Sequence, residues 1–176
     1  MTVYKPGEDT YLVLEHLEGL SLEDKKFLDM GTGNGEIAFK AAEKGAEVTA
    51  VDKNPEALDY AREKAEKRGL EDSIDFVESD LFENVGREFD VVVFNPPYLP
   101  GDEGLGDEEI WRGGEKGIEV TEKFLEQVSE YLRPEGFGLV VASSLGDSEG
   151  LGERYGLEPV GEKSLWFEEL RLLRFD

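Results

Sequence analysis

Short apolar runs alternate along this chain with longer stretches in which apolar residues recur every three or four positions. Five of the runs are short and bounded by polar or turn-forming residues, as buried strands are: residues 26–30, 47–51, 73–77, 90–94 and 137–142. Strands that alternate with amphipathic helices are typical of α/β proteins. The pattern therefore predicts an open, mostly parallel sheet with helices on both of its faces.

The intervening stretches carry start and stop signals of helices. Asn54 and Pro55 suit the beginning of a helix, and Gly69 suits its end. The expected helices run from about residue 8 through a stripe that ends at Leu20, from 36 to about 44, from 55 to 68, from 117 to 132 and from 149 to 154. Residues 157–163 and 165–175 are predicted to form two final strands, and residues 99–116 a long polar loop.

Composition bounds the class of protein. The 176 residues suit one domain over 1–176, and no linker or repeat divides them. There is no cysteine and one histidine, so the sequence indicates no metal site. No apolar run approaches about 18 residues, which argues against a membrane span and for a cytoplasmic protein.

The charge is strongly acidic, with 42 acidic against 19 basic residues and a formal net charge of −23. Such a surface repels phosphate backbones, which argues against nucleic acid as a partner. The acidic residues are spread along the whole chain, which favours adaptation to a saline cytoplasm over a localised acidic docking face.

Polar residues follow the fourth apolar run directly, in the stretch Asn95-Pro96-Pro97-Tyr98. The prolines stop a strand, since neither can donate a backbone hydrogen bond. The Asn95 side chain can accept a hydrogen bond from a planar NH2 group and donate another, and the Tyr98 ring can cover a flat face. The same four residues also suit a plain strand-ending turn, so this stretch alone leaves both interpretations open.

A glycine-rich loop, Gly31-Thr32-Gly33-Asn34-Gly35, follows the first apolar run. Glycine lets a backbone approach a ligand closely. A dinucleotide-binding fingerprint would place its third glycine at the position of Glu36, and a carboxylate there would repel a pyrophosphate. The loop therefore suits a nucleoside without phosphates.

Two acidic residues stand at the ends of the next two runs. Asp52 lies 21 residues after Gly31, a spacing that suits a carboxylate accepting both ribose hydroxyls. Asp80 could accept a hydrogen bond from an adenine amine, although either residue could also be a simple strand-ending acid. Because ligands of such sheets bind beyond the carboxyl ends of the strands, these acids, the loop and Asn95 are expected to meet at one edge.

These motifs, from Asp29 through the glycine loop, Asp52 and Asp80 to Asn95-Pro96-Pro97-Tyr98, resemble those of class I S-adenosylmethionine-dependent methyltransferases. The chain is more specifically similar to the HemK-like family, which methylates the glutamine side-chain amide of translation release factors, in residues 4–10, 111–117 and 167–170. The resemblance spans nearly the whole chain. It implies a Rossmann-like fold with a mostly parallel seven-stranded sheet, helices on both faces and a C-terminal antiparallel hairpin.

The resemblance also implies S-adenosylmethionine as cofactor and a role for each matching residue. Glu8 and Thr10 would lie near its methionine part. The other expected cofactor contacts are Asp29, Gly31, Gly33, Asp52, Asp80, Leu81 and Asn95. Asn95, Pro96 and Tyr98 would form the catalytic clamp, in which the Asn95 side chain and the Pro96 carbonyl hold the two hydrogens of the target amide.

A partner subunit is implied as well. Bacterial members of the family carry a helical substrate-binding domain before the catalytic one, whereas this chain begins almost at Tyr4 and resembles the short archaeal and eukaryotic branch. For that branch the resemblance implies a small zinc-binding activator. The third strand, with Ile74, Phe76 and Val77, is expected at the sheet edge, where strand addition is possible.

Three functions follow as hypotheses. The first is methylation of the glutamine in a Gly-Gly-Gln motif of a class I release factor. The second is methylation of an adenine amine in DNA or RNA by the same clamp, against which the acidity and the lack of a target-recognition domain count. The third, a nucleoside-binding module without activity, would not require the clamp.

Overall fold

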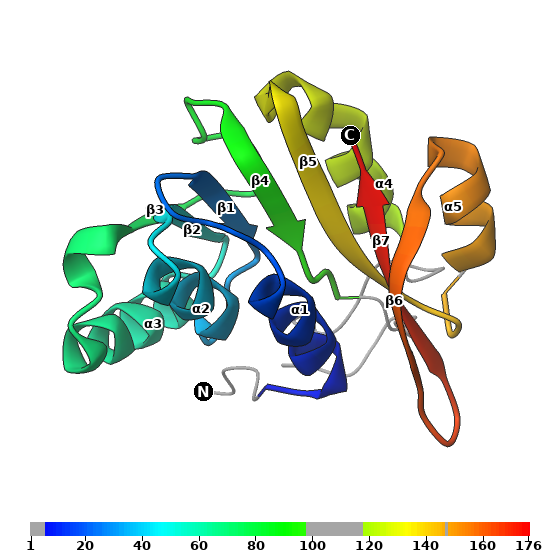
Figure 1. Ribbon diagram of the computed structural model, residues 1–176, viewed down its shortest axis with the longest axis horizontal. Helices are drawn as coiled ribbons and strands as arrows, with labels where there is room; N and C mark the ends of the chain where they lie inside the picture. The colour runs from blue at the N-terminus through cyan, green and yellow to red at the C-terminus, as the bar shows by residue number, and fades with distance from the viewer. Residues whose placement is uncertain (1–5, 98–117, 147) are drawn as a thin grey trace.

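The computed structural model describes residues 6–97, 118–146 and 148–176 (Figure 1). Seven strands form one sheet in the order β3-β2-β1-β4-β5-β7-β6. The parallel strands are β1 (Lys26–Met30), β2 (Glu47–Asp52), β3 (Ile74–Glu78), β4 (Phe89–Phe94) and β5 (Leu132–Ser143). An antiparallel hairpin of β6 (Glu158–Ser164) and β7 (Glu169–Phe175) completes the sheet, which confirms the predicted architecture.

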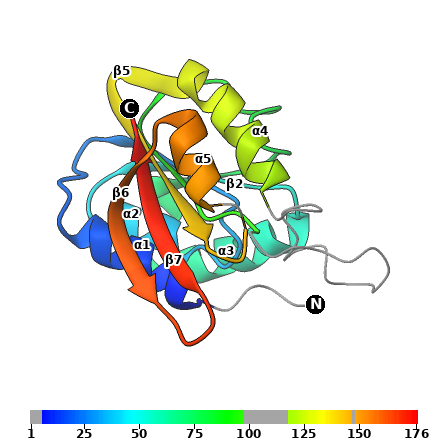
Figure 2. The same ribbon diagram turned by 90° about the vertical axis from the view of Figure 1, so that its right-hand side faces the viewer.

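Helices cover both faces of the sheet (Figure 2). One face carries α1 (Glu8–Glu18), α2 (Glu36–Glu43) and α3 (Pro55–Arg68), and the other carries α4 (Glu119–Gln127) and α5 (Ser148–Tyr155). Short 3-10 helices at Glu71–Ser73 and Val128–Tyr131 lead into β3 and β5. Among the described residues, no helix is long and apolar enough to cross a membrane.

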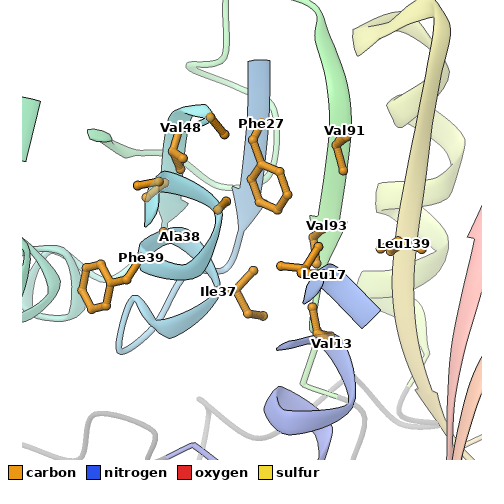
Figure 3. Close-up of a cluster of buried hydrophobic side chains, with 14 of the residues drawn as sticks. Val13, Leu17, Phe27, Ile37, Ala38, Phe39, Val48, Val91, Val93 and Leu139 are labelled. Atoms are coloured by element: carbon orange, nitrogen blue, oxygen red, sulfur yellow. The ribbon is translucent and has the colours of Figure 1, made fainter. Parts of the chain in front are cut away.

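Each face of the sheet buries its own apolar cluster, because successive side chains of a strand point to opposite sides. In β1, Phe27 belongs to the cluster under α1 and α2, and Leu28 belongs to the cluster under α4 and α5. Figure 3 shows the first cluster, which includes Val13, Leu17, Phe27, Ile37, Phe39, Val91, Val93 and Leu139. Each large side chain fully buried here contributes about 1.5–3 kcal/mol of stability.

Local signals set the ends of α3 as predicted. The Asn54 side chain accepts a hydrogen bond from the Glu56 backbone N–H at 3.0 Å, and Pro55 occupies the first helical position. Gly69 ends the helix with φ +69°, the left-handed conformation that glycine adopts without strain. The helix is thus bounded by its own sequence.

The helix predicted over residues 117–132 is wrong at its C-terminal end, because α4 stops at Gln127 and Leu132 begins β5. Leu132 pairs with Phe89, and the register then jumps so that Val91 pairs with Phe137. Gly136 lies in this irregular stretch, where an added Cβ would stand 2.9 Å from the Phe89 carbonyl oxygen. The tertiary pairing with β4 overrides the apolar helical stripe.

The last strand was also predicted too long. It begins at Glu169 and not at residue 165. A hydrogen bond from the Leu165 N–H to the Glu168 carbonyl, 2.8 Å long, closes a turn between β6 and β7. The apolar residues Trp166 and Phe167 extended the predicted strand, but both lie exposed in this turn.

A buried carboxylate joins the sheet to α2. Asp29, in β1, is 1% exposed, and its Oδ2 accepts hydrogen bonds from the Thr32 hydroxyl (2.7 Å) and from the Ala38 N–H (3.1 Å) in the first turn of α2. Its Oδ1 has no hydrogen-bond partner among the described residues. Burial raises the pKa of the Asp29 carboxyl to about 7. The two hydrogen bonds act to lower this pKa, and the nearby Asp52 carboxylate acts to raise it further.

This raised pKa predicts a specific pH dependence of stability. The folded state holds the Asp29 proton more tightly than the unfolded chain, in which this carboxyl has its ordinary pKa of 3.8. The protonated Asp29 therefore contributes its full stabilisation of the folded state below pH 3.8, and this stabilisation is lost as the pH rises through 7. The free energy of unfolding of Asp29→Asn, relative to wild type, should rise by about 1–3 kcal/mol between about pH 5 and pH 8. Urea titrations at several pH values measure it.

Asp72→Asn, which removes an exposed carboxylate, is the matched control and should follow the wild-type curve. An identical pH dependence for Asp29→Asn and wild type would contradict the raised pKa.

Candidate active site

The predicted polar residues meet at one edge of the sheet. Strands β3, β2, β1 and β4 are parallel neighbours, so their carboxyl ends lie side by side (Figure 1). The glycine loop follows β1, Asp52 ends β2, Asp80 follows β3, and Asn95 follows β4. The first turn of α1 reaches the same edge, since Asp9 contacts Asn95 there.

The glycine loop adopts a conformation that side chains would strain. Gly31, Gly33 and Gly35 have φ values of +66°, +52° and +84°. At Gly35 a Cβ would stand 2.4 Å from the Phe39 ring, so the loop closes tightly on α2. Gly31 is exposed and Gly33 half-buried, which leaves their backbone accessible to a ligand.

Asp52 holds this loop from the side. Its Oδ2 accepts a hydrogen bond from the Gly33 N–H, and its Oδ1 accepts one from the Asn54 N–H, each at 2.9 Å. The residue is half-buried. A carboxylate oxygen can accept more than one hydrogen bond, so Asp52 can still accept from the hydroxyls of a ribose.

Glu36 is turned away from the loop toward α3. Its carboxylate lies 2.6 Å from the Lys64 ammonium and 3.0 Å from the Arg68 guanidinium. Partial burial works to raise the pKa of Glu36, but these two cations outweigh it and hold the pKa below its ordinary value. Because Glu36 pairs with both cations, they are engaged away from a ligand on the glycine loop.

Asp80 and Leu81 lie beside the end of β2. The Ser79 N–H donates to the Asp52 carbonyl at 3.0 Å, and the Ser79 hydroxyl donates to the Leu81 carbonyl at 2.9 Å. Leu81 takes a φ of +48°, a conformation uncommon for residues other than glycine. Asp80 is exposed and lines an open hollow whose other walls are Lys53, Glu78, Ser79, Glu83 and Asn84.

The clamp residue Asn95 has one end of its amide engaged and the other free. Its Nδ2 donates a hydrogen bond to Oδ2 of Asp9 at 3.0 Å. Its Oδ1 is buried and has no partner among the residues that the structure describes. An acceptor in this state costs free energy unless a ligand supplies a donor, which marks it as a candidate contact for substrate.

The remaining predicted residues differ in their surroundings. Thr10 is buried, whereas Glu8 is exposed and pairs with Lys163 of β6 at 3.3 Å. Pro96 is buried directly after Asn95. Tyr98 lies outside the described residues, as do Tyr4 and residues 111–117. The roles assigned to all of these residues stay predictions.

Sequence reasoning missed Asp9. By local pattern Asp9 is an acidic residue in the first turn of α1, where it complements the helix dipole. The available signal was its place between Glu8 and Thr10, two residues already expected in the site. Its contact with Asn95 joins positions 86 residues apart, and no local pattern reports such a contact.

Comparison with known proteins gives consistent similarities. The chain is 38% identical over 97% of its length to a putative protein N5-glutamine methyltransferase of Methanocaldococcus jannaschii, covering 90% of that protein. It is 39% identical over 72% of its length to a release factor glutamine methyltransferase of Deinococcus radiodurans, but it spans only about half (48%) of that protein.

A solved structure has the same fold. It is the E. cuniculi Mtq2-Trm112 complex, responsible for the methylation of the translation termination factor eRF1. It matches with a TM-score of 0.76 at 28% identity, over 97% of this chain and 96% of the matched one. The family model described as Methyltransferase small domain matches residues 5–157. With the glycine loop, Asp52 and Asn95 gathered at one edge of this sheet, the chain belongs to the Methyltransferase small domain family.

Proposed function

We propose that this protein transfers a methyl group from S-adenosylmethionine to the side-chain amide nitrogen of a glutamine in a Gly-Gly-Gln motif of a translation release factor. The observation that carries the proposal is the buried Oδ1 of Asn95, an acceptor at the carboxyl edge of the sheet that has no partner among the described residues. The names of the relatives support it, since one is named a release factor glutamine methyltransferase and another a putative protein N5-glutamine methyltransferase.

The residues present fit this cofactor. The backbone at Gly31 and Gly33 is accessible, and Asp52 can hold the ribose hydroxyls. Glu36 keeps Lys64 and Arg68 engaged, which suits a nucleoside without phosphates. The exposed Asp80 and the adjacent Leu81 would hold the adenine, and Glu8 and Thr10 the methionine part. Asp29 supports the loop from beneath, through Thr32 and α2.

When bound, S-adenosylmethionine supplies a methyl group activated by a positively charged sulfur. The protein's part is to make a poor nucleophile reactive, because the lone pair of an amide nitrogen is delocalised. Asn95 Oδ1 and the Pro96 carbonyl accept hydrogen bonds from the two hydrogens of the target amide. They draw electron density back to the nitrogen and hold its lone pair toward the methyl group, so catalysis rests on orientation and electrostatics. Tyr98 would cover the flat face of the amide, and the surplus amide proton leaves to solvent.

Adenine also offers a planar NH2 group, so the clamp alone does not distinguish glutamine from a base. The net charge of −23 opposes the approach of a nucleic acid, which would also have to flip the base out of its stack. The two relatives are named as glutamine methyltransferases, one of them as putative. Glutamine is therefore the favoured target.

The outer edge of β3 suits the predicted activator. Within the described part of the chain, no strand pairs with this edge. Ile74 is buried, so the accessible apolar groups are the half-buried Phe76 and Val77. The Arg62 guanidinium lies 5.4 Å from the Phe76 ring centroid and covers one of its faces. A strand added here would satisfy the open backbone groups. The solved Mtq2-Trm112 complex supports a partner subunit, and the family resemblance implies that it is small and binds zinc.

The substrate assignment is tested by offering purified release factor, its Gly-Gly-Gln to Gly-Gly-Ala variant and bulk nucleic acid in parallel, with labelled cofactor, at low and high salt. Label should enter the wild-type factor alone. Asn95→Ala should lose most of this transfer while its cofactor affinity stays within a few fold, because the role of Asn95 in transfer is to bind the target amide. High salt screens the repulsion of nucleic acid, so that arm tests the charge argument separately. Equal labelling of the glutamine-free variant, or transfer mainly to nucleic acid, would refute the assignment.

Asp52→Ala should weaken cofactor binding by about 1–3 kcal/mol, the scale of hydrogen bonds lost to a charged group. Calorimetry with S-adenosylmethionine measures the change. The control is Asp75→Ala, which removes an exposed carboxylate from the neighbouring strand and should bind as wild type does. Unchanged affinity in Asp52→Ala would remove this residue from the proposed cofactor site.

Co-expression with a homologue of Trm112 should raise the solubility and the activity of the chain. Phe76→Asp should weaken that association, because it places a charge on the apolar part of the β3 edge. Phe167→Asp, which changes an exposed aromatic residue between β6 and β7, is the control and should leave association intact. Folded Phe76→Asp protein that binds the partner with wild-type affinity would argue against this edge.

A further inference from the structure

The contact between Asp9 and Asn95 has a fixed direction. A carboxylate has no N–H to donate, so only the Nδ2 end of the Asn95 amide can face Asp9. The two atoms lie 3.0 Å apart. The side-chain oxygen and nitrogen of asparagine have nearly the same shape, so packing alone distinguishes them poorly. Asp9 makes the two orientations of the amide unequal in energy.

The orientation decides which group Asn95 offers on its other side. With Nδ2 directed to Asp9, the group left over is Oδ1, which is buried and has no partner among the described residues. An oxygen in that place accepts a hydrogen bond from a substrate NH2 group. With the Asn95 amide reversed, its N–H groups would face the N–H groups of the substrate, and the two sets of donors would repel each other.

Asp9 is itself firmly placed. It is 4% exposed, and its Oδ1 accepts a hydrogen bond from the Thr10 N–H at 2.8 Å while its Oδ2 accepts from Asn95. Helix α1 is anchored in the first apolar cluster through Val13 and Leu17, both fully buried. Both oxygens of Asp9 therefore act as acceptors on a rigid element.

We infer that Asp9 is a positioning residue that sets the orientation of the Asn95 amide and thereby makes the clamp selective for a substrate that carries an NH2 group. The inference rests on the proposed function for the identity of that substrate. In this inference Asp9 acts on the reaction through its hydrogen bond to Asn95.

The substitution Asp9→Asn tests this directly. In the wild-type protein the Thr10 N–H and Asn95 donate to different oxygens of Asp9. An amide at position 9 has an oxygen at only one of these two places, so in the same conformation it accepts from the Thr10 N–H or from Asn95, but not from both. If it keeps the bond to Thr10, it offers N–H to Asn95, whose amide then reverses. We expect kcat for release factor to fall about tenfold or more, with the Kd for S-adenosylmethionine within about twofold of wild type.

A double variant in which the two residue types are exchanged, Asp9→Asn with Asn95→Asp, distinguishes a role of Asp9 in orienting Asn95 from a role in supporting α1. Asn95→Asp alone places two carboxylates against each other. In Asp9→Asn with Asn95→Asp, the amide at position 9 accepts from the Thr10 N–H and donates to the carboxylate at position 95, whose second oxygen faces the substrate. The kcat of the exchanged pair should therefore exceed the kcat of Asn95→Asp by about tenfold. If the two substitutions acted independently, their losses would multiply, and the kcat of the exchanged pair would be lower than that of Asn95→Asp.

A readout independent of catalysis comes from the side-chain amide of Asn95 in 15N-labelled full-length protein, assigned by its disappearance in Asn95→Ala. Its signals should shift in Asp9→Asn and stay in place in Glu15→Gln, which removes an exposed carboxylate further along α1. Glu15→Gln should also keep wild-type kcat.

The outcomes are distinct. If Asp9→Asn retains wild-type kcat, or if the exchanged pair is no better than the product of its single substitutions, the inference is overturned. If Asp9→Asn does not fold, the exchanged pair, which restores the missing hydrogen bond, decides the question. If wild type transfers methyl groups to nucleic acid and not to release factor, the proposed function fails. The same variants, assayed on the adenine amine, then still test Asp9.

Discussion

Two carboxylates hold the glycine loop in place, and the site depends on them. Asp29 accepts from the Thr32 hydroxyl and from the Ala38 N–H in the first turn of α2, beneath the loop. Asp52 accepts from the Gly33 N–H at its side. Glycines with positive φ lose more conformational entropy on folding than other residues, so a loop built from them needs fixed acceptors to stay in one shape. The loop and the two strand ends therefore form one unit.

Acidic residues are gathered at the carboxyl edge of the sheet, in addition to those spread along the chain. Asp9, Asp52 and Asp80 lie near the ends of neighbouring parallel strands. Two local cations, Lys64 and Arg68, are engaged by Glu36. An edge of this charge suits a cationic nucleoside and disfavours a dinucleotide or a nucleic acid strand. Local pairing therefore refines what the net charge of −23 only suggests.

The clamp shows how a static contact can support chemistry. Asp9 takes the Nδ2 end of the Asn95 amide, which leaves the Oδ1 end as the acceptor of the proposed clamp. A buried acceptor without a partner among the described residues costs free energy. In the proposed function this cost is recovered when the substrate amide donates to the acceptor. A group preorganised in this way needs no movement at the moment of reaction.

The element order, the ends of α3 and the meeting of the glycine loop, Asp52, Asp80 and Asn95 at the carboxyl edge could be predicted from the sequence. These follow from local rules: apolar period, the Asn54 and Gly69 caps, and the shared edge of parallel strands. The sequence alone was wrong at Leu132, where pairing with Phe89 overrides a helical stripe, and at the start of β7. It also missed the contact of Asp9 with Asn95 and the engagement of Glu36 by α3. Those features depend on residues far apart in the chain, and only the packed structure brings such residues within hydrogen-bonding distance.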